Sequence, residues 1–143
     1  MTLRSILFGT GATSRATDLG LLVLRLGLGL TLAFGHGLGK LPPSAGFIEA
    51  TAEMGFPLPT FFAWAAALSE FAGGLLLAVG LATRPAAFLV ACTMATAFFL
   101  AHGGIVGEGE KALLYLVGAV ALMLTGAGRF ALDPRLDRPA TYA

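Results

Sequence analysis

Charge is what this sequence has least of. Asp, Glu, Lys and Arg together make up 12% of its 143 residues, about half the ~25% that is typical of soluble domains. Hydrophobic residues make up 57%, and the mean hydropathy is +0.85. So few charges cannot cover a water-facing surface, which excludes a soluble globular domain. The composition instead predicts an integral membrane protein of a single domain.

Cysteine is almost absent as well. Cys92 is the only one, which excludes an internal disulfide, a haem-attachment motif and a cysteine-bound iron–sulfur cluster. The formal net charge is +1 and no Lys/Arg cluster is present, so no nucleic-acid partner is predicted. A glycine-rich stretch ends at Lys40, but Leu41 stands where a phosphate-binding loop requires Ser or Thr. The sequence therefore predicts no intrinsic cofactor.

Long apolar runs are what the chain does have. A hydrocarbon core of ~30 Å needs a helix of ~20 residues, and proline and glycine separate four candidate segments. These are Leu19–Leu38, Thr60–Leu81, Ala86–Ala101 and Ala112–Ala127. The sequence predicts an all-α membrane bundle of four antiparallel spans over residues 19–128. The first run exceeds the core of a signal peptide and contains a charge, so we expect it to be retained.

The connection between the first two spans holds a further apolar stretch. Ala45–Met54 lies between Pro43 and Pro57 and carries Phe47 and Ile48. We predict a short helix at the membrane interface here, with an ordered loop as the alternative.

The distribution of Lys and Arg predicts the topology. The segments before the first span, between the second and third, and after the fourth carry six arginines, namely Arg4, Arg15, Arg84, Arg129, Arg135 and Arg138. The two remaining connections carry only Lys40 and Lys111. We therefore expect the flanking segments 1–18 and 129–143, and both termini, to be cytoplasmic.

Two charges lie inside the predicted spans. Arg25 is in the first and Glu70 in the second, and an ionised group near a bilayer centre costs at least ~2.5–3.5 kcal/mol on insertion scales. Such residues face partners or water inside a bundle and are functional-site candidates. Arg25 and His36 are eleven residues apart, which returns to within about 20° of the same helix face. Small residues such as Gly73 and Gly74 surround Glu70 and allow close helix approach.

Histidines complete the candidate site. Side chains lean toward the N-terminus of their own helix, so His36 and His102 should converge on Glu70 from the outer half of the bilayer. We predict one polar column of Arg25, Glu70 and the histidines, into which Tyr115 hydrogen-bonds. It would bind a ligand or handle protons. The alternatives are a structural ion pair for Glu70, helix-end caps for the histidines and an interfacial aromatic for Tyr115.

A metal site is the weaker interpretation of the same residues. Two histidines and one carboxylate are suitable ligands for a transition metal. However, the sequence has no HxxxH or HxxE spacing that would hold two of them on one helix face. We therefore predict no metal.

Several motifs together resemble one known family. They are "LRLGLGLTLAFGHGLGKL", "FIEATAEMGFPLP", "SEFAGGLLLAVGLATRPAA", "AHGG" and "GAGRFALD". On these motifs the chain resembles the DoxX family of small four-helix bacterial membrane proteins, from about Asp18 to Asp133. The matching residues are Arg25, His36, Gly37, Lys40, Glu70, Gly73, Gly74, Arg84, His102, Gly103, Arg129 and Asp133.

The resemblance implies a setting in the bacterial inner membrane. The family takes its name from a subunit associated with a thiosulfate:quinone oxidoreductase, so it implies a membrane subunit linked to a redox complex. A quinone or a redox partner protein would then carry the electrons, because the sequence has neither a nucleotide fingerprint nor a cysteine pair. The alternative is a non-catalytic scaffold or assembly partner whose polar column is structural. Small-solute transport is a third hypothesis, although paired broken helices are not evident in the sequence.

Overall fold

The computed structural model describes residues 14–133, and the elements in this range are all helical. The predicted cytoplasmic segments 1–18 and 129–143 lie largely outside the described residues, as do Arg4, Arg135 and Arg138. In order, the elements are α2 (Arg15–Leu32), η1 (Ala33–Gly37), η2 (Leu38–Lys40), α3 (Ala45–Glu53), α4 (Pro59–Leu68), η3 (Ser69–Gly73), α5 (Gly74–Val79), α6 (Thr83–Thr96), η4 (Ala97–Ala101) and α7 (Val106–Thr125).

Within residues 14–133, three continuous helical runs are long and apolar enough to cross a membrane. They are Arg15–Lys40, Pro59–Val79 and Thr83–Ala101, and each overlaps a predicted span. The helix α7, which overlaps the fourth predicted span, has 20 residues but carries Glu108, Glu110 and Lys111 near its start. It begins six residues before the predicted Ala112, because these charged residues continue the helix at its exposed end.

The helix boundaries have local causes. Ser14 caps α2, where its Oγ accepts a hydrogen bond of 3.1 Å from the backbone N–H of Thr17. Ser44 caps α3 in the same way, with 3.2 Å to the N–H of Phe47. The helix predicted between the first two spans is therefore confirmed, over Ala45–Glu53. At the end of α5, Gly80 adopts a φ of 72°, the left-handed conformation that closes many helices.

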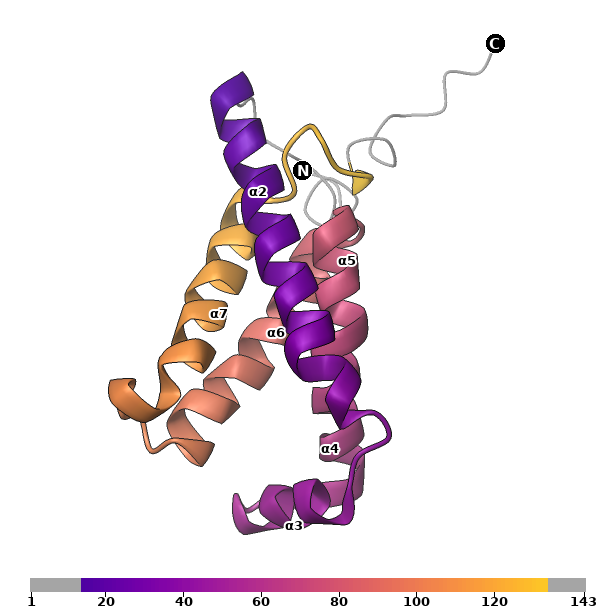
Figure 1. The fold of residues 1–143 in the computed structure, drawn as a ribbon, viewed down its shortest axis with the longest axis vertical. Coiled ribbons are helices and arrows are strands. Elements are labelled where there is room, and N and C mark those ends of the chain that lie inside the picture. Colours follow the sequence, from indigo (N-terminus) through magenta and orange to yellow (C-terminus); the bar gives the residue numbers. More distant parts are fainter. Residues whose placement is uncertain (1–13, 134–143) are drawn as a thin grey trace.

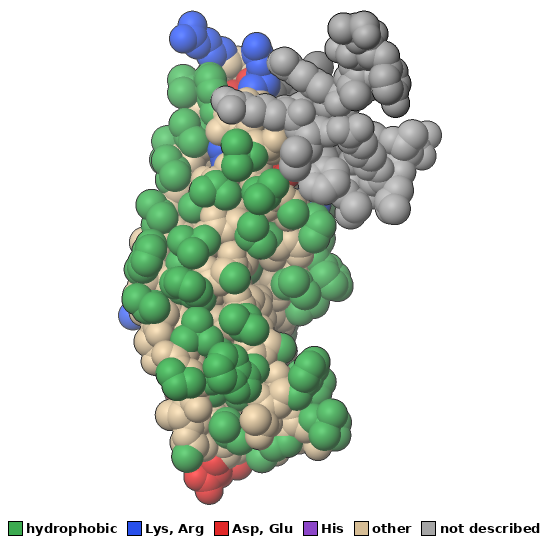
Figure 2. Space-filling view, turned by 90° about the vertical axis from the view of Figure 1, so that its right-hand side faces the viewer, with side chains coloured by type: hydrophobic (Ala, Val, Ile, Leu, Met, Phe, Trp, Pro, Cys, Tyr) green, Lys and Arg blue, Asp and Glu red, His purple; other side chains and the backbone are tan. Residues whose placement is uncertain are grey.

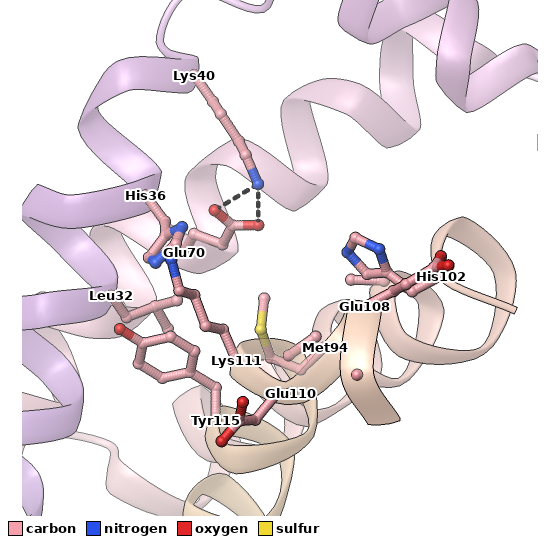
Figure 3. A pocket seen from close by; sticks show the side chains of 13 residues that line it. Leu32, His36, Lys40, Glu70, Met94, His102, Glu108, Glu110, Lys111 and Tyr115 are labelled. Atoms are coloured by element: carbon pink, nitrogen blue, oxygen red, sulfur yellow. Dashed lines mark hydrogen bonds and ion pairs between the residues drawn. The ribbon is translucent and has the colours of Figure 1, made fainter. Parts of the chain in front are cut away.

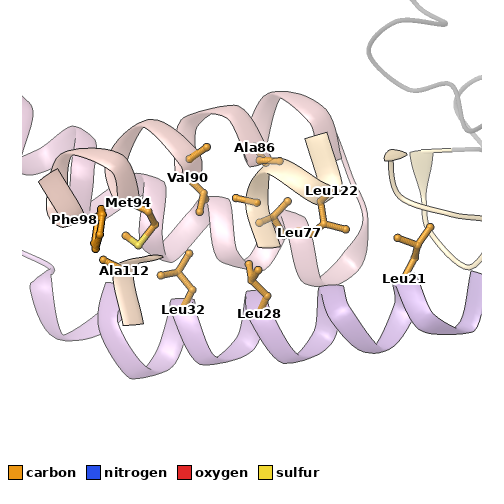
Figure 4. Close-up of a cluster of buried hydrophobic side chains, with 13 residues drawn as sticks. Leu21, Leu28, Leu32, Leu77, Ala86, Val90, Met94, Phe98, Ala112 and Leu122 are labelled. Atoms are coloured by element: carbon orange, nitrogen blue, oxygen red, sulfur yellow. The ribbon is translucent and has the colours of Figure 1, made fainter. Parts of the chain in front are cut away.

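Four helices surround the core. α2 contacts α5 on one side and α7 on the other, and α6 contacts both α5 and α7 (Figure 1). Between them lie apolar side chains that include Leu28, Leu32, Leu77, Val90 and Leu122 (Figure 4). α3 lies across one end of this group, next to α4 (Figure 1). The closed ring of contacts buries the apolar core between the helices.

The outer surface is apolar too. Val23, Phe61, Leu114 and Leu124 are each more than 60% exposed. Figure 2 shows one face covered mostly by hydrophobic side chains, with the charged ones gathered mainly toward its two ends. A surface of this kind is suited to lipid rather than water.

Two glycines set the distance between α2 and α5. A Cβ added at Gly74 would lie 2.7 Å from the carbonyl oxygen of Gly29 and 3.0 Å from the backbone nitrogen of Ala33. The backbones are therefore in direct contact, as small residues permit in membrane helices. This contact fixes how the first two long helices are aligned.

We predict opposite effects of alanine at two neighbouring glycines of α2. Gly29→Ala should lower the melting temperature in detergent, because its methyl group meets the backbone of α5. Gly27→Ala is the matched control, since a Cβ there meets nothing within 4 Å. It should leave stability unchanged or raise it, as alanine favours a helix over glycine by up to ~1 kcal/mol. Equal effects of the two substitutions would contradict the close crossing.

Candidate functional site

An ion pair joins the end of the first long helix to the middle of the second. The carboxylate of Glu70 accepts hydrogen bonds from Lys40 Nζ, at 2.6 Å to Oε1 and 2.8 Å to Oε2. The Glu70 side chain is 2% exposed and that of Lys40 is 35% exposed. Lys40 Nζ also lies 5.3 Å from the ring centroid of Phe47 on α3, within the range of a cation–π contact. The pair is therefore buried on the Glu70 side and open on the Lys40 side.

The backbone around the pair explains its geometry. Gly37 of η1 lies so close to η3 that an added Cβ would sit 2.6 Å from Phe71 Cα and 2.7 Å from the carbonyl carbon of Glu70. Because the two backbones are so close at Gly37, the next turn, η2, places Lys40 within hydrogen-bonding distance of the Glu70 carboxylate. The sequence places glycine where the two backbones touch, and the ion pair forms beside that contact.

A polar cavity of about 390 Å³ opens beside this ion pair. We call it the polar cavity; Figure 3 shows its side chains. Its walls come from α2, η1, η2, η3, α6 and the first turns of α7. The polar side chains that line it are those of His36, Lys40, Glu70, His102, Glu108, Glu110, Lys111 and Tyr115.

Four of the five predicted site residues meet in this cavity. His36 and His102 lie on opposite sides of the Lys40–Glu70 pair (Figure 3). The ring of Tyr115 stands edge-on to that of His36, with centroids 5.5 Å apart. His36, His102 and Glu70 thus line one shared cavity. The imidazole nitrogens and the phenol oxygen offer hydrogen-bond donors and acceptors to a ligand there.

The fifth predicted residue, Arg25, is elsewhere. Its buried guanidinium donates to the carbonyls of Leu77 (3.4 Å), Ala78 (3.1 Å) and Phe130 (2.7 Å). The first two belong to the last turn of α5, about 11 Å further along the helix than Glu70 at 1.5 Å per residue. The prediction of one column containing Arg25 and Glu70 is therefore wrong. Arg25 instead joins the last turn of α5, where its positive charge is favourable, to the segment after α7.

Two buried carboxylates near Arg25 bind the backbone, a role that the sequence does not predict. Asp133 accepts hydrogen bonds from the N–H groups of Ala82 (2.6 Å) and Thr83 (2.8 Å) at the start of α6. Asp18 accepts one of 2.9 Å from the N–H of Arg129. We call these two residues and Arg25 the end clasp, because they attach the segment after α7 to the ends of other helices. The contacts of Asp133 with the start of α6 explain the aspartate of the "GAGRFALD" motif without a ligand.

Lys40 is the site residue that sequence reasoning misses. The sequence places it in a loop, where it counts only for topology, although it lies among the residues that match the family. The available signal is its position, since a long side chain at the end of the first span leans back along its own helix and can reach a buried carboxylate such as Glu70.

Unusual helical turns accompany the site. His36 lies within the π-helical turn η1, Glu70 within η3, and His102 directly follows η4. Such turns bond residue i to i+5 and are frequent at functional sites. Three such turns around one cavity support its interpretation as a binding site.

A second, larger cavity adjoins the first. It has about 810 Å³, and we call it the apolar groove. It lies between α4 and α6 and shares Lys40, Glu70, Ala97 and His102 with the polar cavity. Most of its other lining residues are apolar, among them Phe62, Leu68, Leu76 and Leu89. The ion pair therefore stands where a polar and an apolar space meet.

Substitutions of the ion pair should be strongly coupled. Lys40→Met leaves a buried carboxylate without its cation and should lower thermal stability in detergent, as breaking a buried pair typically costs ~3–5 kcal/mol. Glu70→Gln should cost less, because the amide is neutral. The double variant should lose less than the sum of the two single variants, with a coupling of about 0.5–3 kcal/mol. Additive losses would show that the two residues do not stabilise one another.

Comparisons with known proteins agree on one family. The DoxX family model matches residues 20–103. CatD of Bacillus subtilis, provisionally named an oxidoreductase, is 35% identical over 123 residues, which cover 85% of this chain and 90% of CatD. The inner membrane protein YqjF of Escherichia coli is 34% identical over 131 residues, which cover 85% of this chain and 95% of YqjF. No solved structure matches significantly. The family match and these two relatives show that the chain belongs to the DoxX family of membrane proteins.

Proposed function

We propose that this membrane protein binds a quinone at the Lys40–Glu70 pair, as a subunit linked to a redox complex. The observation that carries the proposal is the meeting of the two spaces at one buried ion pair. A quinone has a ring with two carbonyl acceptors and an apolar tail. The polar cavity offers donors to the ring, and the apolar groove offers a medium for the tail. Binding sites commonly combine an apolar wall with a few placed polar groups.

Each polar residue has a distinct part in this proposal. Lys40 is partly exposed and its ammonium group has three donors, so it can donate to a quinone carbonyl while it keeps its bond to Glu70. His36 or His102 donates to the same ring through an N–H. Reduction of a quinone to a quinol takes up two electrons and two protons. The histidines and Glu70 are the groups that handle the protons in this proposal, because their imidazole nitrogens and carboxylate line the polar cavity where the ring would lie.

The electrons come from a partner protein in this proposal. The chain has a single cysteine and no nucleotide-binding motif, so its own sequence offers no redox couple. The name of CatD as an oxidoreductase supports a redox setting for that relative. For this chain it supports the proposal of an accessory subunit.

A second candidate function is that of a membrane scaffold or assembly partner. One observation favours it, namely that Glu70 already has a complete partner in Lys40. In that case the ion pair only aligns the first two long helices. The two candidate functions differ in one measurable property. A quinone should raise the melting temperature if the protein has a quinone site and should leave it unchanged if the protein is a scaffold.

We further propose that the chain spans the inner membrane four times, in antiparallel order, with both termini in the cytoplasm. α7 has a break from helical geometry at Gly109, and its part from Glu110 to Thr125 rises about 24 Å at 1.5 Å per residue, most of the ~30 Å hydrocarbon core. α7 packs along α6, which belongs to one of the three apolar runs. Its three early charges would then lie at the interface, where the polar cavity also opens.

Reporter fusions test this topology. Fusions after residue 143 should be active with a cytoplasmic reporter and silent with a periplasmic one, because six arginines lie in the proposed cytoplasmic segments and two lysines outside them. A fusion in the connection between η4 and α7 should behave in the opposite way. Periplasmic activity at the C-terminus would overturn the orientation.

A short-chain quinone should stabilise the purified protein. A ligand that binds only the folded state adds ~2.7 kcal/mol at a concentration of one hundred times its Kd, so the melting temperature should rise by several degrees. Glu70→Gln and His36→Ala should abolish this rise, because they remove polar groups of the polar cavity. Thr31→Ala is the control, since Thr31 is on the same long helix but exposed outside the cavity. A rise that persists in both cavity variants would contradict a site at the ion pair, and no rise with any quinone would favour the scaffold.

A further inference from the structure

The apolar groove has a wide side toward the lipid. α4 packs against α3 and η3. Within the described residues, α4 and α6 have few contacts or none with each other. Figure 1 shows α4 and the end of α6 separating toward the end where α3 lies. The groove fills this separation, lined by Leu68 of α4 and Leu89 of α6. These two side chains are 47% and 55% exposed, so the groove opens on the apolar outer surface.

The groove is long, as its lining residues show. Along the second long helix its lining runs from Phe62 to Leu76, a rise of about 21 Å at 1.5 Å per residue. Ala65, Ala66 and Gly73 line this helix on the groove side and leave room for a ligand. A quinone ring needs far less length, so the ring alone leaves most of the groove unused. An extended hydrocarbon chain fits both its length and its lining.

The polar end of the groove selects one kind of chain. Lys40, Glu70 and His102 belong to the groove and to the polar cavity at the same time. Ser69 also lines the groove, and its buried hydroxyl has no hydrogen-bond partner among residues 14–133. A plain hydrocarbon would leave these polar groups without a partner at its end. An amphiphile with a hydrogen-bonding head matches both the polar end of the groove and its apolar lining.

We infer that the ligand is a long-chain amphiphile that enters from the lipid bilayer between α4 and α6, with its tail in the apolar groove and its head at Lys40–Glu70. This inference rests on the proposed function and adds the class of substrate and its route. The head contacts Lys40 and Glu70, which also line the polar cavity at the end of the bundle. The tail lies in the apolar groove, which is open to lipid. The tail therefore contributes to affinity through close packing against the groove lining, because its transfer from lipid to an apolar groove brings no hydrophobic gain.

The chain carries its own reporter for this groove. Cys92 is the only cysteine, is exposed, and lines the groove on α6. A bound tail should cover it. A membrane-permeant maleimide should therefore react with Cys92 more slowly when a quinone with a ten-carbon tail is present. The rate should fall about tenfold at ten times the Kd, by mass action.

Three controls make the result specific. A tail-less quinone with the same ring should raise the melting temperature without protecting Cys92. A cysteine placed at Val23, in a Cys92→Ala background, should react at the same rate with and without the tailed quinone, because Val23 is 71% exposed on α2 and outside the groove. Ala66→Phe should fill the groove, so that the tailed quinone binds no more tightly than the tail-less one. If Ala66→Phe does not fold, Leu89→Trp replaces it on the opposite wall.

The outcomes separate this inference from the proposed function. If both quinones stabilise the protein and neither protects Cys92, the head binds but the groove does not hold the tail, and the inference is overturned alone. If neither quinone stabilises the protein, the proposed function fails first. Equal protection by phospholipid without quinone would mean that an ordinary lipid occupies the groove. Protection without any ligand, in a dimeric fraction, would mean that a second copy covers it. Both of these last results overturn the inference.

Discussion

A carboxylate buried among apolar helices has to find a cation, and this requirement organises the end of the molecule that holds the candidate site. Glu70 has its cation in Lys40, which reaches it from the end of the first long helix at 2.6 Å. The pair forms only if the two helices are correctly aligned. Backbone contact at Gly29 and Gly74, and again at Gly37, supplies that alignment. The ion pair, the polar cavity and the apolar groove are consequences of one helix-to-helix fit.

The two ends of the molecule use their polar residues differently. In the end clasp, the buried groups bind backbone groups at helix ends, with Arg25 on three carbonyls and Asp133 on two N–H groups. At the other end the polar side chains face a cavity. Buried charge alone therefore does not distinguish fold from function in this chain. What separates them is whether open space adjoins the charged group, and only the Lys40–Glu70 pair among these residues borders the polar cavity or the apolar groove.

Much of this arrangement could be predicted from residue types, and the exceptions have physical reasons. Apolar length predicts the three long runs, and prolines with a serine cap predict α3. Shared depth brings His36, His102 and Glu70 to one cavity. The prediction of one column fails at Arg25, because its guanidinium donates to backbone carbonyls about 11 Å further along the second long helix than Glu70. The carbonyl partners of Arg25 and the backbone partners of Asp133 come from distant segments, which no spacing within one helix can reveal.

The most direct test of the central claim is photoaffinity labelling with a quinone that carries a photoreactive group on its ring, followed by mass spectrometry of the labelled peptides. The label should attach near Lys40 and Glu70, and excess unlabelled quinone should prevent the labelling. Labelling confined to the outer apolar surface around Val23 and Leu114, and insensitive to excess quinone, would contradict a binding site at the ion pair.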